Sequence, residues 1–200
     1  MVSPGRLVPG TYYHVFNRGN NREDVFREPR NYSHFLRLLA QYIEPVAETY
    51  AYCHLPNHFH CLVRIRDDEA SNGTRQAAGT HGASEQFGRL FNAYAKAINK
   101  AYARSDSLFE HPFRRVAVAS DAHFSQLVVY IHRNPQKHGL VQDFREWRHS
   151  SYPAHLASGP TRVQRETVLA WFDGPQGYIH AHEVDAADPS IGPLIEDDCD

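Results

Sequence analysis

The stretch HLPNHFHCLV, residues 54–63, places two histidines two positions apart within an apolar run. Side chains alternate between the two faces of a β-strand, so a strand over residues 58–65 has one wholly apolar face: Phe59, Cys61, Val63 and Ile65. The other face carries His58, His60, Leu62 and Arg64. The two imidazoles would lie about 6–7 Å apart along the strand. They could share one metal ion, or they could be half-buried polar residues that only form hydrogen bonds.

The segments around this strand predict an α+β fold. Aromatic and β-branched content indicates further strands at 11–18, 48–55 and 113–120. Apolar residues recur at helical spacing in 32–43, 87–103 and 120–135. The last of these helices should begin at a Ser120 or Asp121 cap and end at Pro135. Beyond WRHSSYPAHL at 147–156, a short helix is expected near 161–172.

The order strand, helix, strand, strand, helix, strand, helix favours a ferredoxin-like or RRM-like antiparallel sheet in the split βαβ arrangement. The short PN link at 56–57 suits an antiparallel hairpin. Two helices should cover the apolar face of the sheet. The face with His58 and His60 should then stay open, and exposed rings such as Tyr12 and His14 could stack on unpaired bases there.

Charge is segregated along the chain. All 21 Lys and Arg residues and 14 of the 23 acids lie in residues 1–165, whose formal charge is +7, whereas residues 166–200 hold the other 9 acids. A basic body fits a polyanion-binding domain, and an ordinary body with a solvated tail fits the composition as well. We expect a main domain at 1–156, a helical extension at 157–182 and a flexible acidic tail at 183–200.

Other features bound the class of protein. Three scattered cysteines are typical of a reducing cytoplasm. No signal peptide or membrane span is evident, so a cytoplasmic location without membrane contact is predicted. The Gly, Ala and Ser-rich segment 67–85 is expected to form a long loop.

Several tyrosines could serve as a nucleophile. Tyr130 and Asn134 are four residues apart and would share one helix face. The same spacing joins Tyr102 to Asp106 and Tyr178 to His182. Spacing alone places Tyr130 only modestly ahead of the other two.

Four motifs in this order resemble the REP-associated tyrosine transposases, which belong to the HUH superfamily of single-strand DNA transposases with the IS200-like enzymes. The motifs are YHVFNRGNNRE, AYCHLPNHFHCLV, YIHRNPQKHGLV and WRHSSY. The resemblance covers roughly residues 10–156 and rests mainly on PNHFH with YIHRNP downstream.

The resemblance implies a metal-dependent endonuclease and strand transferase that cleaves single-stranded DNA near REP-like hairpins through a 5′-phosphotyrosine. His58 and His60 match the histidine ligands, with Phe59 as the bulky residue between them. Tyr130 matches the nucleophile and Asn134 the third ligand, for Mg²⁺ or Mn²⁺. A monomer or a homodimer would fit.

The basic and amide side chains of the turn after the first strand, with those near the fourth strand and third helix, are candidate DNA contacts. They are Arg18, Asn20, Asn21, Arg22, Arg114, Arg115 and Lys137. Two alternatives stay open. One is a relaxase or replication-initiator nickase with the same chemistry, and the other is a non-catalytic protein that binds DNA hairpins.

Overall fold

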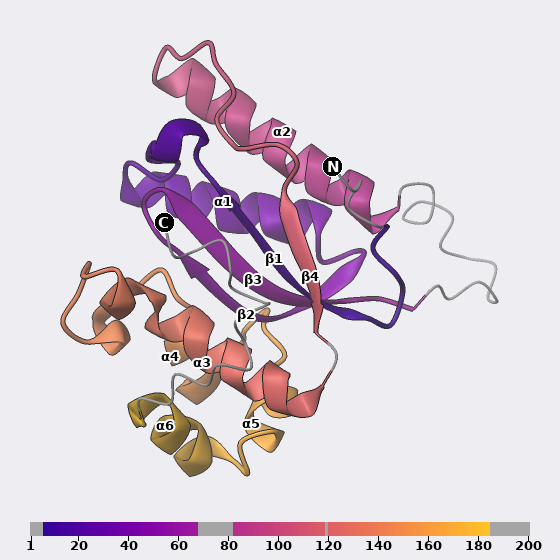
Figure 1. The fold of residues 1–200 in the computed structure, drawn as a ribbon, viewed down its shortest axis with the longest axis vertical. Helices are drawn as coiled ribbons and strands as arrows, with labels where there is room; N and C mark the ends of the chain where they lie inside the picture. Colours follow the sequence, from indigo (N-terminus) through magenta and orange to yellow (C-terminus); the bar gives the residue numbers. More distant parts are fainter. Residues whose placement is uncertain (1–5, 68–81, 119, 185–200) are drawn as a thin grey trace.

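The computed structural model describes residues 6–67, 82–118 and 120–184. Its strands are β1 (Tyr12–Arg18), β2 (Ala47–His54), β3 (His58–Ile65) and β4 (Arg114–Val118). Its α-helices are α1 (Pro29–Tyr42), α2 (Ala83–Ala101), α3 (Asp121–Lys137), α4 (Tyr152–Leu156), α5 (Arg165–Ala170) and α6 (Pro175–Glu183). Short 3₁₀ turns lie at η1 (Asn20–Arg22) and η2 (Phe144–Glu146). The predicted α+β class is confirmed (Figure 1).

The four strands form one antiparallel sheet in the order β2-β3-β1-β4. β2 and β3 form the predicted hairpin, with Cys53 opposite His60. β1 lies on the other side of β3, where Phe16 is opposite His60, and Arg114 of β4 is opposite Phe16. This register gathers side chains from three strands around His60 on one face.

Helices α1 and α2 lie together against the apolar face of the sheet, as predicted (Figure 1). The helices contribute Phe35, Leu38, Leu39, Phe87, Leu90, Phe91, Tyr94 and Ile98 to this core. From β3 the core receives Phe59, Cys61, Val63 and Ile65. The face assignment made for residues 58–65 therefore holds, because every predicted apolar position lies in this core.

The second face of the sheet is not open, contrary to the sequence-based expectation. α3 crosses it over β2 and β3, with α4, α5 and α6 beyond it (Figure 1). Leu127, Val128 and Ile131 of α3 pack in a second core with Leu62 of β3. That core also holds Val168, Phe172 and Tyr178 from the C-terminal segment. α3 has apolar residues to bury, and the sheet face is where it buries them.

The outer edge of β2 is covered by two extended segments. Ser150 forms an antiparallel bridge with Cys53, and Val163 forms a parallel bridge with Thr49. The backbone N–H of His54 donates to the carbonyl of His149 at 3.0 Å. The WRHSSY motif thus satisfies backbone groups that an exposed edge strand would leave unpaired.

Two boundaries differ from prediction. Ser120 caps α3 through His123, as expected, but Pro135 lies inside this helix rather than at its end. A proline inside a helix costs about 3 kcal/mol, and the burial of the apolar Leu127, Val128 and Ile131 of the same helix offsets it. α2 begins at Ala83, so the last residues of the predicted 67–85 loop are helical, and 68–81 lie outside the described residues. Nearly all of the predicted acidic tail, 185–200, does so too.

No helix in the described ranges is long and apolar enough to cross a membrane.

Candidate active site

His58 and His60 lie side by side on the face of the sheet that α3 crosses. Their ring centroids are 5.1 Å apart. His58 Nδ1 is 2.6 Å from Asn57 Oδ1, and His60 Nδ1 is 3.0 Å from His14 Nε2. Because each Nδ1 has a neighbour, Nε2 is the nitrogen that each ring would offer to a metal ion.

Both rings are neutral at physiological pH. Burial, with His138 as the next cause, lowers the pKa of His58 to about 3. Burial also lowers the pKa of His60 well below its usual value, with His58 adding to the effect. A neutral imidazole is the form that binds metals, so this environment suits coordination.

Helix α3 carries the third predicted ligand. Asn134 is fully buried and donates from Nδ2 to the Tyr130 carbonyl at 3.2 Å, which leaves Oδ1 as an acceptor. Among the described residues, Asn134 Oδ1 and His58 Nε2 are buried without a hydrogen-bond partner. Such atoms cost about 1–3 kcal/mol each, and a ligand bound by both would remove that cost.

The residues on either side of Asn134 show where its helix face lies. The ring of Tyr130, one turn earlier, is 5.8 Å from that of His60. The ring of His138, one turn later, is 5.0 Å from that of His58. Residues four apart share a helix face, so Asn134 lies on the face turned toward both histidines.

His58 and His60 can hold a small divalent cation only if the side-chain amide oxygen of Asn134 takes part as a third ligand. In the described ranges no three His, Cys, Asp or Glu side chains are grouped so that they could hold a metal ion. Two imidazoles with an amide oxygen form a partial coordination sphere. Mg²⁺ and Mn²⁺ keep water or substrate oxygens in their remaining positions.

Of the three candidate tyrosines, only Tyr130 stands beside the histidines. Its half-buried ring meets those of His60 and His14 edge-on, and Lys137 Nζ lies 4.9 Å from its centroid. The Tyr102 hydroxyl instead donates to the side chains of Glu28 and Asn31 at the N-terminal end of α1.

Tyr178 is fully buried against His132. Neither Tyr102 nor Tyr178 adjoins the histidine pair.

A cleft of about 460 Å³ opens next to His58 and His60. Three of the predicted DNA-contacting residues line it: Arg18, Arg22 and Arg114. Arg18 forms an ion pair with Glu110 at 3.8 Å, and both line the cleft. Asp24 lines the cleft as well, so three arginines and two acidic side chains face it, and the lining keeps a small net positive charge beside the predicted ligands.

The other four candidates lie elsewhere. Asn20 and Asn21 belong to the η1 turn, outside the residues that line the cleft. Lys137 is exposed at the end of α3, over Tyr130. Arg115 faces the opposite side of the sheet, where it stacks on Phe113, because neighbouring strand residues point to opposite faces.

The turn after β1 has a backbone that few residues tolerate. Asn21 and Arg22 have φ values of 55° and 60°, in the left-handed region that costs a non-glycine residue energy. A Cβ on Gly19 would come within 2.0 Å of the Glu23 carbonyl oxygen. The turn next to Arg18, which carries Arg22 into the cleft, therefore depends on a glycine at position 19 and on a left-handed backbone at positions 21 and 22.

Tyr12 and His14 do not form an exposed stacking platform, contrary to expectation. His14 is fully buried. Tyr12 packs edge-on against Tyr50 and Phe124, with ring centroids 5.1 Å away in both cases. Because α3 and the C-terminal segment cover this part of the sheet, bases could not stack on these rings.

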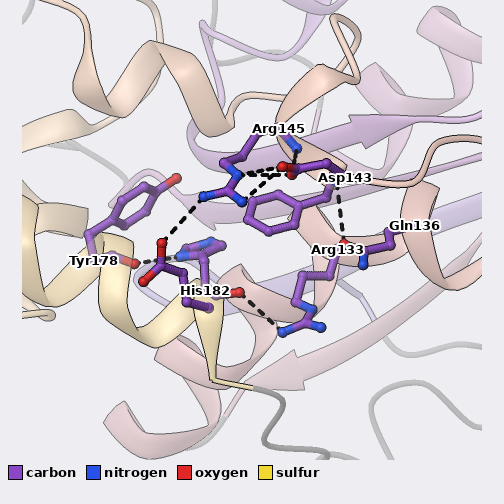
Figure 2. Close-up of polar contacts among 8 residues, drawn as sticks. Arg133, Gln136, Asp143, Arg145, Tyr178 and His182 are labelled. Carbon is purple, nitrogen blue, oxygen red and sulfur yellow. Dashed lines mark hydrogen bonds and ion pairs between the residues drawn. The ribbon is translucent and has the colours of Figure 1, made fainter.

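The C-terminal segment fixes the position of α3 (Figure 2). Arg133 of α3 donates to the carbonyls of His182 and Val184 at 3.1 and 3.2 Å. His132 Nδ1 is 2.9 Å from His182 Nε2, and Arg145 bridges Asp143 and Glu183. His132 and Arg133 lie between Tyr130 and Asn134 in sequence. Their contacts with the C-terminal segment therefore hold the helical turn that carries Tyr130 and Asn134.

Three residues near the site were not assigned to it from sequence: His14, Asn57 and His138. His14 was expected to be an exposed ring, whereas strand register places it against His60. Asn57 adjoins His58 in the PNHFH motif, and that adjacency was its only sequence signal. His138 lies four residues after Asn134, and this spacing could have indicated it.

The chain is similar in sequence to a curated protein. A Haemophilus influenzae protein assigned to the REP-associated tyrosine transposases is 28% identical over 107 residues, covering 52% of this chain and 58% of that protein. The resemblance predicted from the motifs is confirmed. The match spans little more than half of the relative's length, and no protein-family model matches the sequence.

One solved structure shares the fold. A REP-associated tyrosine transposase bound to a REP hairpin aligns with a TM-score of 0.61 at 18% identity, over 80% of this chain and 87% of that chain. At this identity the likeness shows the fold alone. A Deinococcus radiodurans protein described as a transposase aligns with a TM-score of 0.38 at 18% identity, over 66% of this chain and 95% of that one. That score is too low to support an argument.

Proposed function

We propose that the protein is a metal-dependent DNA transposase of the REP-associated tyrosine type, which cleaves single-stranded DNA near hairpins and rejoins strands. The observation that carries the proposal is the placement of the Tyr130 ring beside the buried, neutral His60, which adjoins the half-buried, neutral His58. Asn134 lies on the same helix face as Tyr130, and its Oδ1 has no hydrogen-bond partner among the described residues. A nucleophile next to a nitrogen and oxygen donor set is what phosphodiester cleavage at neutral pH requires.

The chemistry assigned to the chain's own residues is a phosphoryl transfer to tyrosine. The Tyr130 Oη–phosphorus bond forms as the bond from phosphorus to the 3′ oxygen breaks. The phenol loses its proton, and the departing 3′ oxygen gains one. A phenol has a pKa near 10, so the phosphotyrosine keeps a good leaving group, and a 3′-OH can reverse the step without an added energy source.

His58, His60 and Asn134 would hold Mg²⁺ or Mn²⁺. When bound, the ion would neutralise and polarise the scissile phosphate. His58 and His60 are already neutral, so no proton has to leave them before they coordinate. The Asn134 amide is orientated by its own bond to the Tyr130 carbonyl, which links the position of a ligand to that of the nucleophile.

The cleft beside the histidines suits a single strand of DNA. Arg18, Arg22 and Arg114 supply positive charge for the phosphates. The hairpin bound in the structural neighbour and the name of the Haemophilus influenzae relative support a REP-like hairpin as the recognised element. The hairpin would bind beyond the cleft, with its single-stranded flank leading to Tyr130.

The substitution Tyr130→Phe tests the function. It removes one oxygen from a half-buried ring and keeps the ring itself, so the free energy of unfolding should fall by no more than about 1.5 kcal/mol, the net contribution of one hydrogen bond. A labelled single-stranded substrate with a REP-like hairpin should still bind. The covalent protein–DNA adduct, seen as a slow band on a denaturing gel, should disappear.

Tyr102→Phe is the matched control. It also removes one phenolic oxygen, but at the base of α1, so the adduct should remain. An adduct that persists in Tyr130→Phe, or that is lost in Tyr102→Phe, would refute the assignment of the nucleophile.

A further inference from the structure

We propose that His14 is a positioning residue for His60: it accepts the Nδ1 proton of His60 and so holds that ring in the tautomer whose Nε2 lone pair can bind the metal ion. This inference rests on the proposed function, because it concerns the same metal site. It assigns a role to a residue of β1 that the YHVFNR motif contains and that the proposed chemistry does not use.

The contact between the two rings is built into the sheet. His14 is opposite Leu62, and Phe16, two residues later, is opposite His60, so His14 and His60 are diagonal neighbours on one face. Their rings are inclined by 22°, and the Nε2–Nδ1 distance is 3.0 Å. His14 is fully buried and stacks on Phe16 on its other side, at 4.6 Å between centroids.

Two nitrogens at hydrogen-bonding distance share one proton. If His14 donates it, the neutral His60 carries its own proton on Nε2, which then has no lone pair for a metal. If His60 donates from Nδ1, its Nε2 is a ligand. The second arrangement is therefore the one in which the site can be occupied, and it requires His14 to carry its proton on Nδ1.

His58 offers an independent parallel. Its Nδ1 is 2.6 Å from Asn57 Oδ1, an oxygen that can only accept. That contact places the proton of neutral His58 on Nδ1 and leaves its buried Nε2 without a hydrogen-bond partner in the described structure. With His14 as acceptor, both histidines adopt the same tautomer.

Partners of this kind usually raise metal affinity about 10- to 100-fold. His14→Phe keeps an aromatic ring in the stack and removes the acceptor. His14→Gln restores an acceptor, because the amide oxygen of Gln extends about as far from the backbone as His Nε2. His54→Phe is the matched control: His54 is equally buried in the same sheet, but it lies among Phe26, Phe35 and Phe59 on the other face.

Binding of Mn²⁺ to the full chain without DNA, followed by the loss of the electron paramagnetic resonance signal of free Mn²⁺, measures the effect directly. His14→Phe should weaken binding about 10- to 100-fold, and His14→Gln should recover most of the loss. His54→Phe should bind as the wild type does. Thermal unfolding of each variant identifies any that fail to fold.

The outcomes separate the two hypotheses. If the wild type does not bind Mn²⁺, or binds it equally after His58→Ala, the metal site of the proposed function fails and the role of His14 fails with it. If the wild type binds through His58 but folded His14→Phe binds equally well, only the role of His14 is overturned. A weakened His14→Phe that His14→Gln does not restore overturns the hydrogen-bonding role in favour of packing.

A second measurement needs no variant. In the wild-type protein with saturating Mg²⁺, long-range proton–nitrogen NMR correlations of the imidazoles report which nitrogen carries each proton. His60 should be protonated on Nδ1, and His14 on Nδ1 as well. Protonation of His14 on Nε2 would refute the inference even if every variant proved unstable.

Discussion

Replacing His54 by phenylalanine is expected to make the protein more resistant to acid. His54 opens the HLPNHFH stretch but faces the core under α1 and α2, not the proposed metal site. Its ring is fully buried, stacks on Phe26 at 5.4 Å and meets Phe35 edge-on at 5.1 Å. Among the described residues neither ring nitrogen has a hydrogen-bond partner, so a phenyl ring suits this position.

The magnitude follows from the titration of His54. Burial, with His149 as a lesser cause, lowers its pKa from 6.5 to about 3 in the folded protein. In the unfolded chain it keeps a pKa of about 6.5. As pH falls below about 6.5 the unfolded chain binds a proton that the folded protein does not, so stability falls until about pH 3. At pH 5 the loss from this residue is about 2 kcal/mol.

Urea unfolding at pH 8 and at pH 5, with EDTA present in every sample, measures this loss. Wild-type protein should lose about 2 kcal/mol more free energy of unfolding between the two pH values than His54→Phe does. Any packing cost of the larger ring is the same at both pH values, so it cancels in the difference.

The control is His180→Gln, which removes an exposed histidine of α6 and should leave the pH difference as in the wild type. An equal loss in wild type and His54→Phe would show that His54 titrates normally in the folded protein.

Two further predictions concern DNA binding. Arg114 lines the cleft while Arg115 faces the other side of the sheet, so Arg114→Ala should weaken binding of single-stranded DNA and lower its salt slope by about 0.7. Arg115→Ala should leave the slope unchanged, and an equal effect of both in salt titrations would contradict this placement. Gly19→Ala should distort the turn, because its Cβ would collide with the Glu23 carbonyl. It should weaken the binding of single-stranded DNA in a gel-shift assay while the protein stays folded, as thermal unfolding would show. Unchanged binding would show that the turn does not present the cleft arginines.

The central hairpin could be predicted because local pattern determines it. The alternation in residues 58–65 assigns each side chain to a face, and the short PN link leaves an antiparallel pairing as the simple solution. The same alternation placed His58 and His60 together. Helical spacing likewise identified α1 and α2, whose single apolar stripes face one sheet.

The environment of the histidines could not be predicted in the same way. Burial of His60 depends on where α3 docks, and an apolar stripe does not say which sheet face it will cover. The contact of His14 with His60 depends on the pairing of β1 with β3, which joins residues 46 positions apart. Pro135 would normally end a helix, but tertiary packing of the neighbouring turn outweighed that preference.

The docking of α3 also explains why the site can work as proposed. An open sheet would have left His58 and His60 in water, with pKa values near 6.5 and partly protonated at physiological pH. Under α3 both stay neutral, and the helix that covers this face of the sheet carries Tyr130 and Asn134. The cleft at the end of β1 leaves room for a strand of DNA on the side that α3 does not cover. In the proposed function, this one packing event prepares the metal ligands, brings the nucleophile to them and leaves the arginine-lined cleft for the substrate.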